Sequence, residues 1–304
     1  MSITMKKTIL TVLFVALCNI VISLEITNEW TCSHKIGQER CIKLITQAGL
    51  SKEYDKAKKY LEISANYGNP LSQAGLGVWY QNDEYGEKDY QKALYWLQKS
   101  AEQGNEKGQS ALADMYSNAW GVKQDYSKAF DLYKKSAEQG DVRAQFHLGV
   151  MYANGYGVQQ DDTQAVKWYR KSAEQGYTDA QASLGYLYRS GKGVQQDYKQ
   201  AMEWYQKAAD KGDPRAQLLI GALYNEGLGV EKDYARALQW YEKAANQNYG
   251  NAQAVIGLMY ENGEGVEKNL TNAQEYYKKA CHNGSSAGCE NLELILSKRL
   301  LIYK

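Results

Sequence analysis

Hydrophobic and small residues recur along the chain with a strict period of 36 residues. Within one copy, Leu148, Gly149 and Tyr152 are spaced as on one face of a helix, and Ala165 and Trp168 begin a second such stretch. This spacing predicts two amphipathic helices in each copy. The period shows most clearly in the aligned pairs Leu76-Gly77, Leu112-Ala113, Leu148-Gly149, Leu184-Gly185, Ile220-Gly221 and Ile256-Gly257.

Polar residues and glycines occupy the expected ends of these helices. An aspartate stands where the second helix needs an N-cap, at Asp89, Asp125, Asp161, Asp197 and Asp233. Glycine pairs follow the first helix, at 155 and 157, 191 and 193, 227 and 229, and 263 and 265. The second helix closes at Gly104, Gly140, Gly176, Gly212 and Gly284, with Asn248 in the same place once. Both prolines, Pro70 and Pro214, follow a capping residue and are predicted in first turns.

A second row of glycines falls inside the first helix, at Gly77, Gly149, Gly185, Gly221 and Gly257. Glycine in a helix interior costs about 1 kcal/mol relative to alanine. We therefore expect a neighbouring Trp or Tyr to pack against the bare backbone.

These patterns predict an all-α fold, an α/α superhelical solenoid of 36-residue helix pairs. We divide the chain into a signal peptide (1–23), an N-terminal cap with a partial repeat (24–69), six repeats (70–285) and a C-terminal capping helix (286–304). The early copies depart from the pattern, because Asp83-Glu84-Tyr85 replaces the loop glycines and Ala113 replaces the helix glycine.

One copy carries a recognisable motif: Ala216 to Gly221, Gly227-Leu228-Gly229-Val230, Asp233, Trp240-Tyr241 and Lys243-Ala244-Ala245. It resembles the Sel-one-like (SLR) repeat family, which is tetratricopeptide-like, and the resemblance extends from residue 52 to about residue 300. It implies a scaffold that engages a protein or peptide. A weaker resemblance to the cysteine-rich secreted branch implies the alternative of a penicillin-binding or weak β-lactamase protein.

The N-terminus has the pattern of a secretion signal. Lys6 and Lys7 precede an apolar run from Ile9 to Ile22, which is short for a membrane span. Cleavage after Cys18 or after Ser23 would fit equally. We expect a periplasmic or secreted protein without a stable membrane span after cleavage. Removing Lys6 and Lys7 from the 36 basic residues leaves 34 against 35 acidic ones, which disfavours nucleic acid as a partner.

The remaining cysteines form two close pairs, Cys32 with Cys41 and Cys281 with Cys289. An even number in an exported chain is typical of disulfides, and two local bridges are predicted. Cys281 ends one predicted helix and Cys289 lies on the next, so their bridge would join adjacent helices.

The sequence offers little catalytic chemistry. The three histidines, His34, His147 and His282, lack zinc-site spacing, and we expect no metal site and no cofactor. The segment 284–288 matches G-x-S-x-G, but predicted helices flank it where a hydrolase needs a strand before the serine. The S-x-x-K and K-T-G motifs of β-lactamases do not occur. The sequence therefore predicts a binding protein with no catalytic residues.

A partner is expected on the face of the first helices that points away from the repeat core, the concave wall of a solenoid. Phe146 and Tyr186 stand there where other copies have small, apolar or acidic residues, so the fold does not require a ring. The predicted partner-binding residues are Phe146, His147, Tyr186, Asn82, Asn118, Asn154 and Asn262. The asparagines carry an alternative interpretation as helix C-caps. The protein or peptide partner is unidentified.

Overall fold

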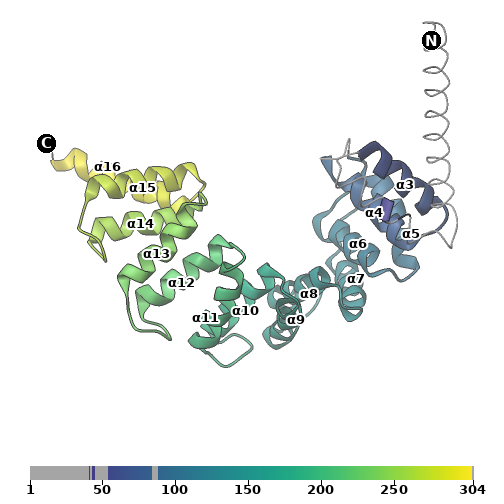
Figure 1. Ribbon diagram of the computed structural model, residues 1–304, viewed down its shortest axis with the longest axis horizontal. Coiled ribbons are helices and arrows are strands. Elements are labelled where there is room, and N and C mark those ends of the chain that lie inside the picture. The colour runs from purple at the N-terminus through teal and green to yellow at the C-terminus, as the bar shows by residue number, and fades with distance from the viewer. Residues whose placement is uncertain (1–40, 42, 45–53, 84–87, 303–304) are drawn as a thin grey trace, which may run out of the picture. The chain divides into compact units, whose positions relative to one another are not determined.

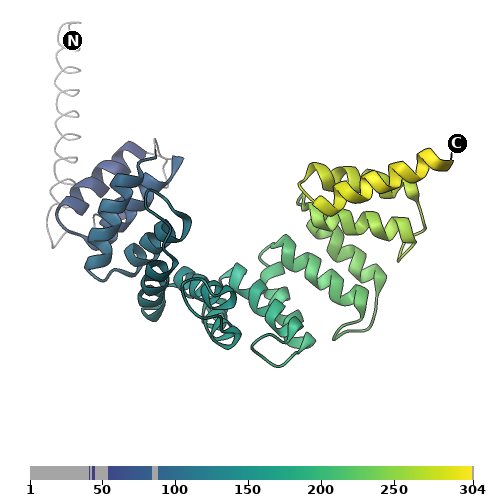
Figure 2. The same ribbon diagram turned by 180° about the vertical axis from the view of Figure 1, so that it is seen from behind.

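The computed structural model describes residues 41, 43–44, 54–83 and 88–302, and these residues confirm the all-α prediction. Figures 1 and 2 show helices joined by short loops. The chain divides into two compact units, Met1–Ala144 and Gln145–Lys304. In both units successive helices pack as pairs, with a period of 36 residues.

The first unit contains five complete described helices. They are α3 (Tyr54–Asn66), α4 (Pro70–Gln81), α5 (Tyr90–Glu102), α6 (Glu106–Asn118) and α7 (Tyr126–Glu138). Helices α4 and α6 are first helices of their repeats, and α5 and α7 are second helices. Leu76 and Leu97 are completely buried in this unit.

The second unit begins within α8 (Val142–Asn154). It continues with α9 (Asp162–Glu174), α10 (Thr178–Ser190), α11 (Tyr198–Ala209), α12 (Pro214–Glu226), α13 (Tyr234–Ala245), α14 (Gly250–Asn262), α15 (Leu270–His282) and α16 (Ser286–Ile302). First helices have even numbers, as in the first unit. Leu184, Tyr205, Ile220, Ile256 and Tyr277 are completely buried between the helices of a pair.

The predicted helix ends are confirmed. The carboxylates of the aspartate row accept backbone N–H groups in the first turn of α5, α7, α9, α11 and α13. Gly191, Gly227 and Gly263 end first helices in the left-handed conformation. Ala119 takes this conformation at the end of α6 with φ of 58°, where later copies have glycine.

The glycines inside the first helices lie against residues of the second helices. A Cβ atom on Gly185 would lie 2.6 Å from the ring of Tyr205, and Gly149, Gly221 and Gly257 face Tyr169, Tyr241 and Tyr277 in the same way. The expected aromatic neighbour is thus confirmed for these four. It is wrong for Gly77, which packs against Leu97.

The second glycine of three loops contacts the preceding repeat. Gly193 lies against the backbone of Asp162 and Thr163, the first residues of α9. Gly229 and Gly265 lie in the same way against Tyr198 and Tyr234, where α11 and α13 begin. These contacts join the loop of one repeat to the start of the second helix before it.

Amide side chains bridge the two helices of most repeats. In each bridge an amide after the second helix donates to a glutamine near the start of the first helix, over 2.7–2.9 Å. The pairs are Gln103–Gln73, Gln139–Gln109, Gln175–Gln145, Gln247–Gln217 and Asn283–Gln253. In the remaining repeat Lys211 replaces the amide and donates to the carbonyl oxygen of Gly176. Gln181 Oε1 is consequently buried without a hydrogen-bond partner among the described residues.

We expect Lys211→Gln to stabilise the protein. The new amide would donate to Gln181 Oε1, and an unsatisfied buried acceptor costs about 1–3 kcal/mol. Loss of the exposed contact with Gly176 offsets part of this gain, so the expected increase in unfolding free energy is about 1 kcal/mol. Urea denaturation would measure it, with Lys199→Gln, at an exposed lysine near the start of α11, as the matched control. Equal effects of the two substitutions would contradict the prediction.

The C-terminal helix covers the end of the second unit's core. Ile295 of α16 is buried against Ala273 and Tyr277 of α15. Cys281 and Cys289 form a disulfide with a Cα–Cα distance of 4.5 Å, which joins α15 to α16 as predicted. Cys32 lies outside the described residues, so its pairing with Cys41 stays a prediction, as does the signal peptide.

Candidate protein-binding surface

Three hollows lie on first helices. We name them the Tyr186 groove, in the second unit, and the Trp120 groove and the N-terminal apolar pocket, both in the first unit. The Tyr186 groove has a volume of about 410 Å³ and the other two about 320 Å³ each.

The Tyr186 groove has an apolar floor and a prominent aromatic ring. Ala182 and Leu187 of α10 and Leu219 of α12 form apolar parts of its lining, and Asn154, the last residue of α8, lies at one end. Tyr186 of α10 also lines the groove and is 47% exposed, although large apolar side chains usually lose most of their exposure on folding. The ring is therefore available to a partner at a concave site.

Charged side chains border this groove. Arg215, at the start of α12, donates to Asp213 over 2.7 Å and also pairs with Asp179. Burial alone would raise the pKa of Asp213, but hydrogen bonds from Arg215 and from the backbone N–H of Ala216 lower it below its ordinary value. Lys192, in the loop after α10, is a second cation in the lining.

A buried hydroxyl lies within the same repeat. Tyr205 is completely buried, and its hydroxyl has no hydrogen-bond partner within the described part of the chain. Burial raises the pKa of Tyr205 well above its ordinary value, so this hydroxyl stays protonated at neutral pH. It is a donor without an acceptor among the residues that the structure describes.

The Trp120 groove lies on α4, α6 and the start of α8. Trp120 follows α6 and stacks on Tyr90, with ring centroids 6.2 Å apart. Asn82, the residue after α4, and Arg143, the second residue of α8, also line the groove. Aromatic, amide and guanidinium groups therefore share one hollow.

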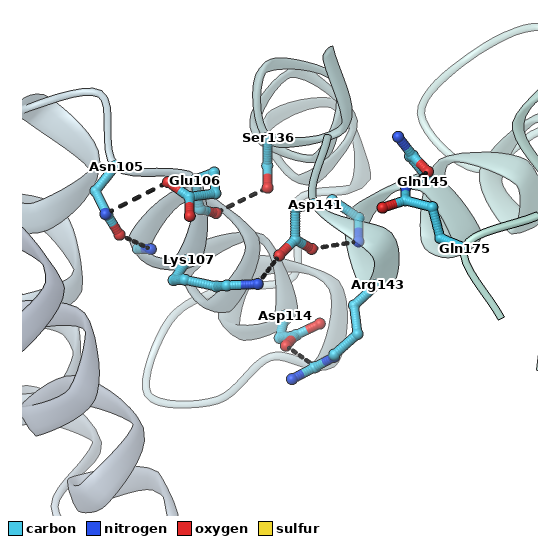
Figure 3. Close-up of polar contacts among 11 residues, drawn as sticks. Asn105, Glu106, Lys107, Asp114, Ser136, Asp141, Arg143, Gln145 and Gln175 are labelled. Atoms are coloured by element: carbon cyan, nitrogen blue, oxygen red, sulfur yellow. Dashed lines mark hydrogen bonds and ion pairs between the residues drawn. The ribbon is translucent and has the colours of Figure 1, made fainter. Parts of the chain in front are cut away.

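The carboxylate of Asp114 links two side chains at the Trp120 groove. Asp114 of α6 accepts a hydrogen bond from the buried hydroxyl of Tyr133 and pairs with Arg143 over 2.7 Å. Close by, Lys107 pairs with Asp141 over 2.6 Å, and Asp141 also caps α8 through the backbone N–H of Ala144. Figure 3 shows these two ion pairs close together, each between a side chain of α6 and one at the start of α8.

The N-terminal apolar pocket lies on α3 and α4. Leu61, Leu71, Ala74 and Val78 provide most of its lining, and Gly75 leaves space at its base. Leu71 is 40% exposed and Val78 is 41% exposed. Two adjacent exposed aliphatic side chains on one helix indicate an interaction surface.

The two grooves occupy equivalent positions of the repeat. Asn82 corresponds to Asn154, Asp114 to Tyr186, and Arg143 to Arg215, and each pair is separated by 72 residues, two periods. The frame of an asparagine and an arginine is kept while the central residue changes. This equivalence was missed from the sequence, although the two arginines 72 residues apart were a usable signal.

Five of the seven predicted partner-binding residues are exposed, and they fall into two groups. Tyr186, Asn82 and Asn154 line grooves and are exposed. Asn118 and Asn262 are exposed last residues of α6 and α14 but line none of the three hollows. The amides of Asn118 and Asn154 donate to carbonyl oxygens of their own last turns, at Asp114 and Val150, as their alternative role as helix caps implies.

Phe146 and His147 differ from the expectation of exposed side chains. Phe146 is half-buried, and its ring packs against the rings of Tyr169 and Tyr177 at centroid distances of 5.6 and 5.2 Å. His147 is also half-buried, with its ring 5.3 Å from that of Phe146. The ring of Phe146 is therefore less exposed than expected, because it takes part in the packing between helices, and its role in partner binding stays a prediction.

Three further features bear on hydrolase chemistry, metal binding and membrane insertion. The segment 284–288 spans the turn after α15 and the first residues of α16, so a helix stands where the hydrolase motif requires a strand. Within the described ranges, no group of three or more His, Cys, Asp and Glu side chains is placed to hold a metal ion. None of the described helices has the length and apolar character needed to cross a membrane.

Known proteins share both the sequence pattern and the fold. The Sel1 repeat model matches residues 46–69, 70–105, 107–141, 142–177, 178–213, 214–249 and 250–285. A crystal structure of a protective antigen of uropathogenic Escherichia coli strains, displaying an SLR fold, is 35% identical with a TM-score of 0.68. That match covers 80% of this chain and 52% of the antigen, so the chain spans about half of the antigen's length.

Two further structures bear on the family. A Sel1 repeat protein from Oxalobacter formigenes is 35% identical with a TM-score of 0.65, over 79% of this chain and 70% of that protein. The cysteine rich protein B of Helicobacter pylori is 27% identical over 42% of this chain and 92% of its own, and its TM-score of 0.35 supports no argument. No curated protein matches the chain. With seven matched repeats and two similar structures, the chain belongs to the Sel1 repeat family.

Proposed function

We propose that this repeat scaffold binds a protein or peptide through its first helices, with the Tyr186 groove as a principal contact site. The observation that carries the proposal is the 47% exposed ring of Tyr186 beside a hollow of about 410 Å³. Tyrosine is among the residues most often found at the energetic centre of protein interfaces. It offers a large contact area and loses little conformational freedom on binding.

The lining suits a peptide in an extended conformation. Ala182, Leu187 and Leu219 offer apolar contact for a side chain, and Asn154 and Ser183 offer groups that can hydrogen-bond a peptide backbone. Arg215 is held by two carboxylates, so it is positioned before a partner arrives. A rigid, ordered lining reduces the entropy lost on binding.

Repetition of the groove supports binding over catalysis. The Asn154–Arg215 frame recurs as Asn82–Arg143, while Tyr186 is replaced by Asp114. Changing one central residue within a fixed frame alters which partner residue is preferred. We propose no enzymatic role, and the β-lactamase alternative has no support beyond the resemblance of the sequence to the cysteine-rich branch.

We further propose that the protein acts outside the cytoplasm, in the periplasm or after secretion. The N-terminal sequence has the basic and apolar regions of a secretion signal. The Cys281–Cys289 bridge supports an oxidising compartment, because cytosolic proteins rarely keep structural disulfides.

Tyr186→Ala is expected to weaken peptide binding at least about tenfold, as for an interface residue that contributes more than about 1 kcal/mol. A random peptide library displayed on phage would be selected on the purified chain, and the affinities of the enriched peptides measured by fluorescence anisotropy. Tyr95→Ala is the matched control, because Tyr95 is 49% exposed but lies on α5, a second helix.

Selection should yield peptides that bind the wild type and the Tyr95 variant equally. Thermal unfolding would verify that both variants remain folded. If the Tyr186 variant kept full affinity for every enriched peptide, the Tyr186 groove would not be the contact site. If selection gave no specific binder, the peptide-binding function itself would be rejected.

A further inference from the structure

We propose that the first helices of the first unit recognise an acidic peptide segment that carries an aliphatic or aromatic side chain. The apolar side chain enters the N-terminal apolar pocket, and a neighbouring carboxylate meets Lys107 and Arg143. This inference rests on the proposed peptide-binding function and names the chemistry of the ligand.

The apolar part of the ligand follows from the lining of the pocket. Leu61, Leu71 and Val78 surround it, and Gly75 leaves room where a Cβ would lie 3.1 Å from Leu61. Ser72 and Lys107 add only a little polar surface to this lining, so a buried polar side chain would lose its hydrogen bonds with water. An aliphatic or aromatic side chain of the partner fits this environment.

The preference for an acidic residue in the ligand follows from two ion pairs in which the cation is exposed and the carboxylate is not. The side chain of Lys107 is 56% exposed and that of its partner Asp141 only 3%. Arg143 is 55% exposed and Asp114 only 10%. Both pairs therefore hold the carboxylate inside and present the cation to solvent, as Figure 3 illustrates. The surface is cationic at this point although the pairs are formally neutral, and it complements a carboxylate.

Neighbouring charged side chains do not cancel the positive potential of Lys107 and Arg143. Lys88 lines the Trp120 groove and pairs with Asp83. Asp83 is the more exposed partner, at 70% against 40%, but it does not line the groove. Asp114 has its two oxygens engaged by Tyr133 and Arg143. Asp141 is likewise engaged by Lys107 and the N–H of Ala144.

The apolar and cationic sites are continuous. Val78 lines both the N-terminal apolar pocket and the Trp120 groove, Lys107 lines the former, and Arg143 lines the latter. One short segment can therefore place an apolar side chain and a carboxylate within the same surface. The exposed amide of Asn82 adds a hydrogen-bonding group for the segment's backbone.

The test starts from the peptides selected on the purified chain. Those that bind the first unit are identified by loss of binding to Val78→Asp, which places a negative charge at the junction of the two sites. We expect these peptides to contain Asp or Glu close to Leu, Ile, Phe or Trp. Their affinity should fall with rising salt concentration, because an exposed charge pair is screened.

Lys107→Gln isolates the charge. We expect Lys107→Gln to weaken the binding of these peptides about three- to fivefold, as for the loss of an exposed ion pair. Asp141 keeps its backbone hydrogen bond in this variant. Lys128→Gln is the control, since Lys128 pairs with the capping residue Asp125 on α7 and lines none of the three hollows. Circular dichroism and thermal unfolding would confirm that Val78→Asp, Lys107→Gln and Lys128→Gln are folded.

The outcomes separate the two proposals. Some peptides will bind the wild type but not Val78→Asp. If these peptides are neutral, or if Lys107→Gln and Lys128→Gln change their affinity equally, the acidic segment is overturned while peptide binding stands. Enriched peptides that all bind Val78→Asp normally would overturn this site alone. If dodecanoate binds the wild type but not Val78→Asp, and no such peptide is found, the ligand of this site is an anionic lipid and not a peptide segment. A selection without any specific binder would overturn both proposals.

Discussion

Gly193→Ala is expected to lower the free energy of unfolding by about 3 kcal/mol or more. Gly193 has φ of +67°, and the left-handed conformation costs a residue with a Cβ about 1–2 kcal/mol. A Cβ there would also overlap the backbone of Asp162 and lie 2.7 Å from the N of Thr163. Relief requires the loop to move away from α9, because backbone atoms cannot rotate aside, and overpacking of this kind costs about 1–3 kcal/mol.

Gly212→Ala separates the two costs. Gly212 has φ of +87°, but a Cβ added to it would meet nothing within 4 Å. This control should lose only about 1–2 kcal/mol, the cost of the conformation. Urea denaturation of both variants would measure the difference. Equal losses would show that the contact between the loop and the preceding repeat contributes nothing to stability.

The fold was predictable because one physical pattern is repeated. Each copy must bury a helix stripe, cap two helices and turn twice, so aligned rows identify core, caps and loops without knowledge of the structure. The wrong prediction at Gly77 has its cause in one row of aligned positions, the one on the second helix that faces the glycine. The second helix supplies Tyr169, Tyr205 and Tyr241 opposite later glycines, but the first copy has Leu97 in that place. The substitution was visible in the alignment of the copies.

The lower exposure of Phe146 has a different cause, since it arises from two rows of aligned positions that vary together. Phe146 packs on Tyr177, which stands where other first helices have a capping side chain and which makes no side-chain cap hydrogen bond. Two periods later, Leu218 and Tyr249 pack against one core cluster, and Tyr249 also lacks a side-chain cap bond. A large residue on one helix therefore accompanies a tyrosine at the next cap. Considering each row separately hides this coupling.

The candidate site was predictable only in part. Tyr186 stood out because its ring is absent from the same position of other copies, and the structure places that ring at a groove. The cationic character of Lys107 and Arg143 was not predictable, because composition counts each ion pair as neutral. It depends on which partner of a pair is buried, and this is decided by how α6 and the start of α8 pack in the fold.

Reduction of the Cys281–Cys289 bridge is expected to destabilise the C-terminal end by about 2–3 kcal/mol, the loop-closure entropy of a short cross-linked loop. The loss should be local. Repeat proteins are stabilised by contacts between neighbouring repeats, so a terminal helix can open while the middle repeats remain folded. Ile295 of α16 is buried in a small cluster with Ala273 and Tyr277 of α15, and Leu292 packs against the same cluster, whereas Leu294 is 56% exposed.

Hydrogen exchange followed by mass spectrometry would measure this effect with and without reductant. Peptides from α15 and α16 should lose protection first, while those from α10 to α12 keep theirs. A Cys281→Ser and Cys289→Ser double variant, in which the bridge cannot form, should reproduce the pattern without reductant. It thereby separates this bridge from any formed by Cys41. Uniform loss of protection across all repeats in the double variant would mean that unfolding is cooperative along the whole chain. The bridge would then stabilise every repeat to the same extent, in conflict with coupling between neighbours alone.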